Sequence, residues 1–195
     1  MEVKSEKIIA AYQSADESGK KLLEGLFPGM NLNKKDERPV IERIRTFEDA
    51  YEELKRRAKA GDNEAIALID EWYCLGSPSA DVVAFVKLRI ICAALNEGWM
   101  PKFTEDETRW YPWHLLYTQK EIDRMSVKEK KELCLMQTTD YVTEYAGFAF
   151  AVSFDAPSFT DAYVGSRFCL KNSELATYCG KQFINLWADF KLLRK

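Results

Sequence analysis

Residues 80–95 read ADVVAFVKLRIICAAL and form the most apolar stretch of the chain. Branched and small apolar residues recur in it at helical spacing, which predicts a buried helix over 79–97. The predicted buried face consists of Val82, Val83, Val86, Ile90, Ala93 and Ala94. Lys87 and Arg89 interrupt the run, which is also too short to cross a bilayer. We therefore interpret it as a core helix and expect no membrane insertion.

Helix signals continue on the N-terminal side of this stretch. Thr46, with Asp49 three residues later, predicts the start of a helix that ends near Gly61. Ser77-Pro78 is typical of an N-cap followed by proline at the first helical position, and predicts where the apolar helix begins. Hydrophobic spacing also predicts a helix over 5–27, although Ser18-Gly19 could interrupt it.

The chain divides at PGMNLNKKDERPV (28–40), which holds two prolines, a glycine and mixed charges. This composition is typical of a linker. We therefore expect an N-terminal helical segment over 1–27, the linker over 28–40, and a single domain over 41–195.

Two capping boxes follow the apolar helix. TQKE (118–121) and SVKE (126–129) both allow the hydroxyl and the glutamate to satisfy backbone amides, and they predict short helices near 118–125 and 127–136. Strand-like composition then predicts a small antiparallel β component near 145–171, including a strand at VGSRFCLK, before a final helix from Asn172 or Ser173. The predicted class is α+β, with a mostly helical N-terminal two-thirds.

The segment between the apolar helix and Thr118 is rich in aromatic residues: Trp99, Phe103, Trp110, Tyr111, Trp113 and Tyr117. Aromatic platforms stack sugars or bases, but aromatic side chains also anchor an irregular segment to a core. We favour core packing. The net charge of −3 gives no basic footprint, so we expect no nucleic-acid partner.

Catalytic and metal chemistry is not evident in the residues. The chain has one histidine, His114, set among aromatic residues, where packing is a better interpretation than general-base catalysis. Five cysteines without CxxC spacing, in a chain without a signal peptide, are expected to be reduced thiols in a protein that is cytoplasmic on synthesis. We predict a non-enzymatic protein without metal or cofactor.

One stretch, YAGFAFAVSFDAPSFTDAYVGS (145–166), differs from the rest of the chain. It contains no Lys, Glu, Gln, Met or Trp, although these five types make up 51 of the 195 residues. A partly buried β-hairpin would account for this composition. The genetic code offers a second explanation, because randomising both adenines of an AAT or AAC codon can never produce those five residue types. Adenine-directed mutagenesis of this kind marks diversity-generating retroelements, which rewrite part of a gene for a binding protein.

Several segments resemble a family of proteins of unknown activity from gut bacterial and phage genomes: RIRTFEDA (43–50), KLRIICAALNEGW (87–99), RWYPW (109–113) and VGSRFCLKNSELATYCGKQFINLWADF (164–190). Relatives often carry Asn near 155, 159, 161 and 163, and Ile at 164. The differences here are reachable by changing only adenines. The resemblance implies a variable region over 148–164 on a C-type-lectin-like scaffold, from which the extra C-terminal helix departs.

We therefore predict a binding protein of phage or mobile-element origin that contacts a protein or glycan ligand through this region. The candidate ligand-binding residues are Phe148, Phe150, Phe154, Asp155, Ser158, Phe159, Asp161 and Tyr163. Their side chains are expected to be exposed on one surface, as the rigid aromatic anchors of antibody paratopes are. The alternative is a structural or virion-associated protein with the same segment in its core, and a homo-oligomer stays open under either hypothesis.

Overall fold

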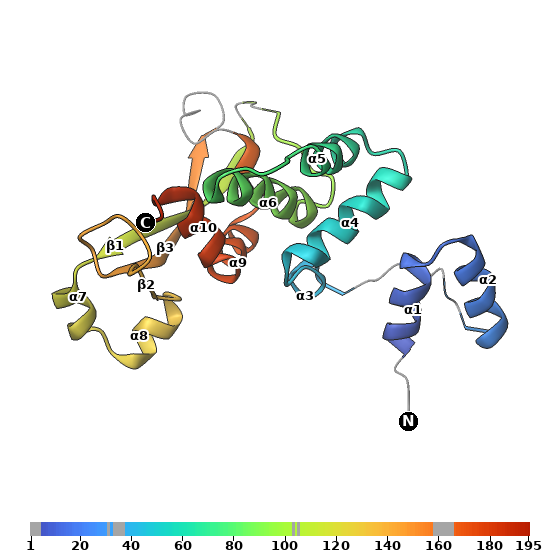
Figure 1. The fold of residues 1–195 in the computed structure, drawn as a ribbon, viewed down its shortest axis with the longest axis horizontal. Helices are drawn as coiled ribbons and strands as arrows, with labels where there is room; N and C mark the ends of the chain where they lie inside the picture. The colour runs from blue at the N-terminus through green and yellow to red at the C-terminus, as the bar shows by residue number, and fades with distance from the viewer. Residues whose placement is uncertain (1–4, 31, 33–37, 103, 105, 158–165) are drawn as a thin grey trace.

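The computed structural model describes residues 5–30, 32, 38–102, 104, 106–157 and 166–195. Within these ranges the chain combines α-helices with one three-stranded antiparallel sheet, which confirms the α+β class. Figure 1 shows α1 (Ser5–Ser14) and α2 (Glu17–Leu26) at one end of the molecule and the three-stranded sheet toward the other. The C-type-lectin-like arrangement stays a prediction.

The apolar stretch forms α6 (Ala80–Leu95), which contacts α4 (Phe47–Lys59), α5 (Asn63–Tyr73) and α10 (Ile184–Lys191). Its second half is buried all round, from Ile90 to Leu95. The first turn of α6 lies outside the protein core, so Val82 is exposed and the prediction that it is buried is wrong. Lys87 lies at the periphery, with its amine 4.8 Å from the Phe47 ring centroid, which explains how a charge is tolerated here.

Most of the predicted helix starts are confirmed. Thr46 caps α4 in a capping box with Asp49. Thr118 and Ser126 do the same for α7 (Gln119–Arg124) and α8 (Val127–Glu132). The start of α6 was wrongly placed, because Ser79, and not Ser77, is its N-cap.

The N-terminal segment forms two helices, α1 (Ser5–Ser14) and α2 (Glu17–Leu26). The break falls just before Ser18-Gly19, because the Asp16 carboxylate caps α2 by accepting from the Gly19 amide at 2.8 Å. These helices share a small apolar cluster around Ile8, Tyr12 and Leu32. The short helix α3 (Val40–Arg43) begins at the last residue of the proposed linker, and the domain boundary stays a prediction.

The sheet holds β1 (Thr108–Tyr117), β2 (Met136–Gln137) and β3 (Gly147–Pro157) in the order β1-β3-β2. The partner of β3 is therefore the aromatic segment that was expected to be irregular. The predicted strand over 164–171 is wrong for its described part, where Ser166–Phe168 form a 3-10 turn, η1. Only an isolated bridge, Trp110 to Leu170, adds this segment to β1.

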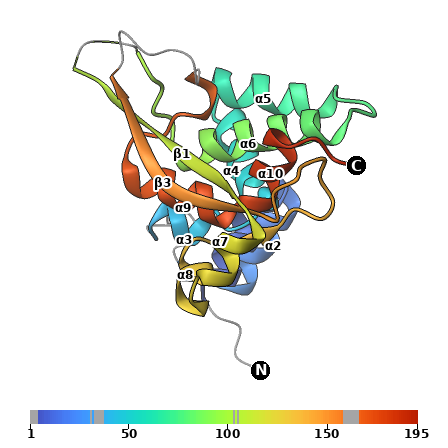
Figure 2. The same cartoon turned by 90° about the vertical axis from the view of Figure 1, so that its left-hand side faces the viewer.

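The predicted C-terminal helix is two helices, α9 (Ser173–Gln182) and α10 (Ile184–Lys191), because the backbone leaves the helical region at Phe183. Helix α9 lies directly on one face of the sheet, and β1 and β3 cross in front of it in Figure 2. Gly180 permits this approach. A Cβ atom there would lie 2.5 Å from Cδ2 of Phe150 and 2.7 Å from Cβ of Pro112.

Replacing Gly180 with alanine is expected to lower the free energy of unfolding by roughly 1–3 kcal/mol, because the added methyl group must push α9 off the sheet. Gly25 is the matched control, because it lies near the end of α2 and a Cβ there meets nothing within 4 Å. Gly25→Ala should leave stability unchanged or raise it by about 0.5–1 kcal/mol. Denaturant unfolding of both variants measures this, and equal effects would contradict the close approach.

Candidate functional site

The structure divides the predicted site residues into two groups. Phe148 and Phe150 are buried, at 3% and 4% exposure, so the prediction that they lie on the surface is wrong. Phe148 stacks on the His114 ring at 4.9 Å between centroids, and Phe150 packs beneath α9. Both side chains belong to the face of β3 that the helices cover, and their role is packing.

Phe154 and Asp155 are exposed, as predicted, and Phe154 keeps 47% of its surface in solvent. Their role in binding stays a prediction. Ser158, Phe159, Asp161 and Tyr163 lie outside the described residues.

A β-bulge at Ala151 causes this division. Phe150 pairs with His114 and Val152 pairs with Trp113, so Ala151 is an extra residue without a partner on β1. Side chains in a strand alternate between faces, and one extra residue moves every later side chain to the opposite face. Without the bulge Val152 and Phe154 would share the buried face of Phe148 and Phe150, whereas with it they point to solvent.

The outer face of β1 and β3 therefore carries a patch of large apolar side chains, which we call the open face. It consists of Trp113, Leu115, Val152 and Phe154, exposed by 40%, 46%, 50% and 47%. Trp113 lies opposite Val152, and its ring centroid is 6.1 Å from that of Phe154. The next residue of this face, Tyr111, is buried beside Trp99 and Cys169, which marks one limit of the patch.

His114 holds the covered face of the sheet to the helices. Its Nε2–H donates to the Gly180 carbonyl at 3.2 Å, which leaves Nδ1 to accept from the Lys191 amine at 3.1 Å. Lys191 is exposed as a residue, but its amine turns toward His114, and burial lowers the pKa of this amine to about 8. Burial and the nearby ammonium group lower the pKa of His114 to about 3. The imidazole is thus neutral, and its contacts are those of a packed residue.

Replacing His114 with glutamine should remove one pH-dependent part of the stability. A histidine whose pKa is lower in the folded state than in the unfolded chain contributes stability above its unfolded pKa, about 6.5, and loses it as the pH falls toward 3. The difference in free energy of unfolding between the protein and the variant should therefore shrink by about 1.4 kcal/mol per pH unit below pH 6.5. Urea unfolding between pH 7 and pH 4.5 measures it, and a difference that does not change with pH would contradict the burial of a neutral imidazole.

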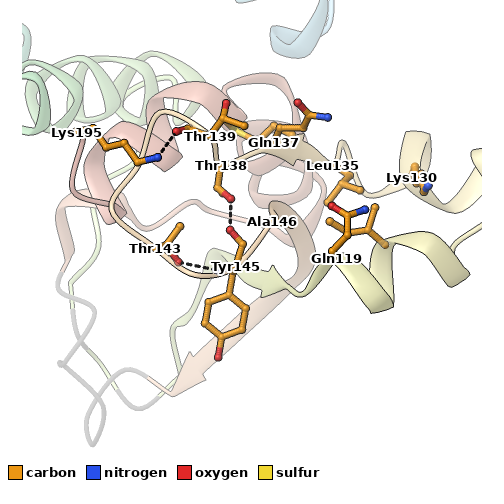
Figure 3. Close-up of a pocket in the computed structure, with 12 residues that line it drawn as sticks. Gln119, Lys130, Leu135, Gln137, Thr138, Thr139, Thr143, Tyr145, Ala146 and Lys195 are labelled. Carbon is orange, nitrogen blue, oxygen red and sulfur yellow. Dashed lines mark hydrogen bonds between the residues drawn. The ribbon is translucent and has the colours of Figure 1, made fainter.

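A pocket of about 440 Å³ lies beside the start of β3, between the α7–α8 pair and the loop that precedes β3 (Figure 3). Its lining is Gln119, Ile122, Lys130, Leu135, Met136, Gln137, Thr138, Thr139, Thr143, Tyr145, Ala146 and Lys195. The loop is fixed by its own hydrogen bonds, because the Thr138 hydroxyl donates to the Tyr145 carbonyl and the Tyr145 amide donates to the Thr143 hydroxyl at 3.2 Å. The sequence did not predict this pocket, and its only local signal was the two capping boxes, which start the helices that supply Gln119, Ile122 and Lys130 to the lining.

Metal and thiol chemistry find little support in the described residues. No group of three or more His, Cys, Asp or Glu side chains is placed there to hold a metal ion. All five cysteines are free thiols, as predicted, and burial raises the pKa of Cys169 to about 12. None of the helices in the part of the chain that the structure covers is long and apolar enough to span a membrane.

Comparisons of the chain with protein-family models, with curated proteins and with solved structures gave no match.

Proposed function

We propose that this chain is a non-enzymatic binding protein that recognises a protein partner through the open face. The observation that carries the proposal is the bulge at Ala151, which places Val152 and Phe154 in solvent beside Trp113 and Leu115. Large apolar side chains gathered on one exposed face are typical of an interaction site. If these side chains served only to fill the core, a regular strand would bury them, and the bulge instead exposes them.

The chemistry of the open face favours a protein over a glycan or a small molecule. Two aromatic rings at its centre and two aliphatic residues beside them match the composition of protein hot spots, where aromatic anchors carry most of the binding energy. A glycan site would add hydrogen-bonding groups for sugar hydroxyls, but Leu115 and Val152 offer none.

The proposal extends to diversification, with a narrower range than 148–164. Buried Phe148 and Phe150 pack against His114 and α9, so varying them would disturb the core. Val152, Phe154 and Asp155 can vary without that cost, because their side chains are exposed. We place the variable positions at 152–164, with Trp113 and Leu115 as constant anchors on the neighbouring strand. Phe148 and Phe150 are buried, so only these two residues fit the alternative in which the segment belongs to the core.

Binding is tested by competition. The immobilised protein is used to retain partners from an extract of the organism that encodes it, and soluble competitors are added in excess. The intact protein should displace a specific protein partner, whereas Trp113→Ser/Phe154→Ser should fail, because it loses both aromatic anchors. Leu22→Ser/Leu26→Ser, which removes two exposed leucines of α2, is the matched control and should compete fully. Equal competition by both double variants would contradict a role for the open face, and a partner lost after glycosidase treatment would indicate a glycan ligand instead.

Diversification is tested at the gene. We expect a reverse transcriptase gene nearby and a template repeat that differs from the coding sequence only at adenines. The mismatches should fall in the codons of 152–164 and spare those of Phe148 and Phe150. A locus without such a repeat, or mismatches in the codons of β1 as well as in those of β3, would overturn this part of the proposal.

A further inference from the structure

We infer that the pocket beside the start of β3 binds a small organic anion, a molecule with a carboxylate or phosphate group on an apolar body. The juxtaposition behind this inference is an apolar floor with two lysines, from different parts of the chain, on opposite sides of the lining. The volume of the pocket, about 440 Å³, is in the range of small-molecule sites. This site is distinct from the open face and does not depend on the function proposed for that face.

The floor of the pocket is apolar and firmly held. Ile122 of α7 and Leu135 after α8 pack directly on β3, because Gly147 offers no side chain: a Cβ there would lie 2.8 Å from Cδ1 of each. The Leu133 carbonyl also accepts from the Phe150 amide at 2.9 Å, which ties the α8 end to the strand. Met136 and Ala146 complete this apolar part of the lining. An apolar ligand body would therefore meet a preformed surface.

The charged side chains in the pocket lining are both positive. The lining contains Lys130 and Lys195 and no carboxylate side chain. The Lys130 amine makes no hydrogen bond or ion pair with the described residues, and the Lys195 amine donates to the Thr139 carbonyl at 2.7 Å. Neither charge is balanced by a carboxylate side chain there. In a half-enclosed site an unbalanced cation attracts an anion more strongly than it would in open water.

Two neighbouring cations are paired, unlike the lysines of the lining. Lys128, two residues before Lys130 on α8, lies 3.7 Å from the Glu132 carboxylate. Arg194, immediately before Lys195, lies 2.8 Å from Asp189. The two lysines that line the pocket differ in this from Lys128 and Arg194, and an anionic ligand would balance their charge.

Neutral side chains in the lining suit the oxygens of an acid. Figure 3 shows Thr143 beside Tyr145 and Gln137 across the loop, on the side where Lys195 reaches Thr139. The Thr143 hydroxyl accepts from the Tyr145 amide and can still donate its own proton. Carboxylate and phosphate oxygens accept such hydrogen bonds, and hydrogen bonds to a charged group are the stronger ones.

Phenyl phosphate, benzoate and neutral benzamide form a matched set of probes, titrated into the full-length protein while backbone amide signals are followed by NMR. Phenyl phosphate, benzoate or both should shift the signals of residues 135–146, and benzamide should bind about tenfold more weakly or not at all. The comparison of the two acids separates a phosphate ligand from a carboxylate ligand. Lys130→Gln should weaken the binding of the anionic probe about tenfold, whereas Lys128→Gln, on the same helix, should leave the affinity for this probe unchanged.

Several results would overturn the inference: benzamide binding as tightly as the acids, equal effects of the two lysine variants, or no shifts in 135–146 at about 10 mM probe, a concentration at which even weak millimolar binding is detected. Binding of methyl glucoside with the same shifts would overturn it in favour of a sugar site. Circular dichroism should be used to check that the Lys130→Gln variant is folded. If it is not, Lys195→Gln provides the same test from the other side of the pocket, with the same expected weakening.

Discussion

The β-bulge at Ala151 determines which side chains of β3 the molecule buries and which it displays. Before the bulge, Phe148 and Phe150 enter the core, and after it Val152 and Phe154 face solvent. The same period-two pattern of large apolar residues therefore serves two purposes along one strand. The attachment of the sheet to the helices depends on the first half, and the open face depends on the second.

The covered half of the sheet gives the displayed half a rigid base. Gly180 lets α9 lie against Pro112 and Phe150, and His114 joins β1 to α9 and α10 through its two ring nitrogens. Behind these helices lies α6, whose second half is buried on every side. A binding surface gains affinity when its anchors are held in place before the partner arrives. The open face has that support, because its strands are fixed from behind.

Much of the helical part follows from local signals in the sequence. Thr46, Thr118 and Ser126 start helices where their hydroxyls predict, since capping is decided within three residues. The sheet was harder to predict because its pairing is not local. Pro112 argues against a strand unless that strand lies at the edge of a sheet, and β1 is such an edge strand, so its pairing with β3 was missed. The alternation in FAFAVSF gives no sign of an extra residue, so Phe148 and Phe150 were grouped with Phe154. The pocket needed the placement of α7, α8, the loop before β3 and Lys195 together, which no local pattern supplies.

A pair of single-residue deletions tests the central claim, that the bulge separates the buried and displayed halves of β3. Deleting Ala151 should restore a regular ladder with Val152 still opposite Trp113, and the melting temperature should stay within about 4 °C, which corresponds to about 1 kcal/mol. Deleting Ala149 removes a paired residue and moves Phe148 out of its register with Leu116, so the melting temperature should fall by far more. If the strand were regular at Ala151, both deletions would reverse the alternation and destabilise the protein alike. Equal losses in the two melting temperatures would therefore contradict the account.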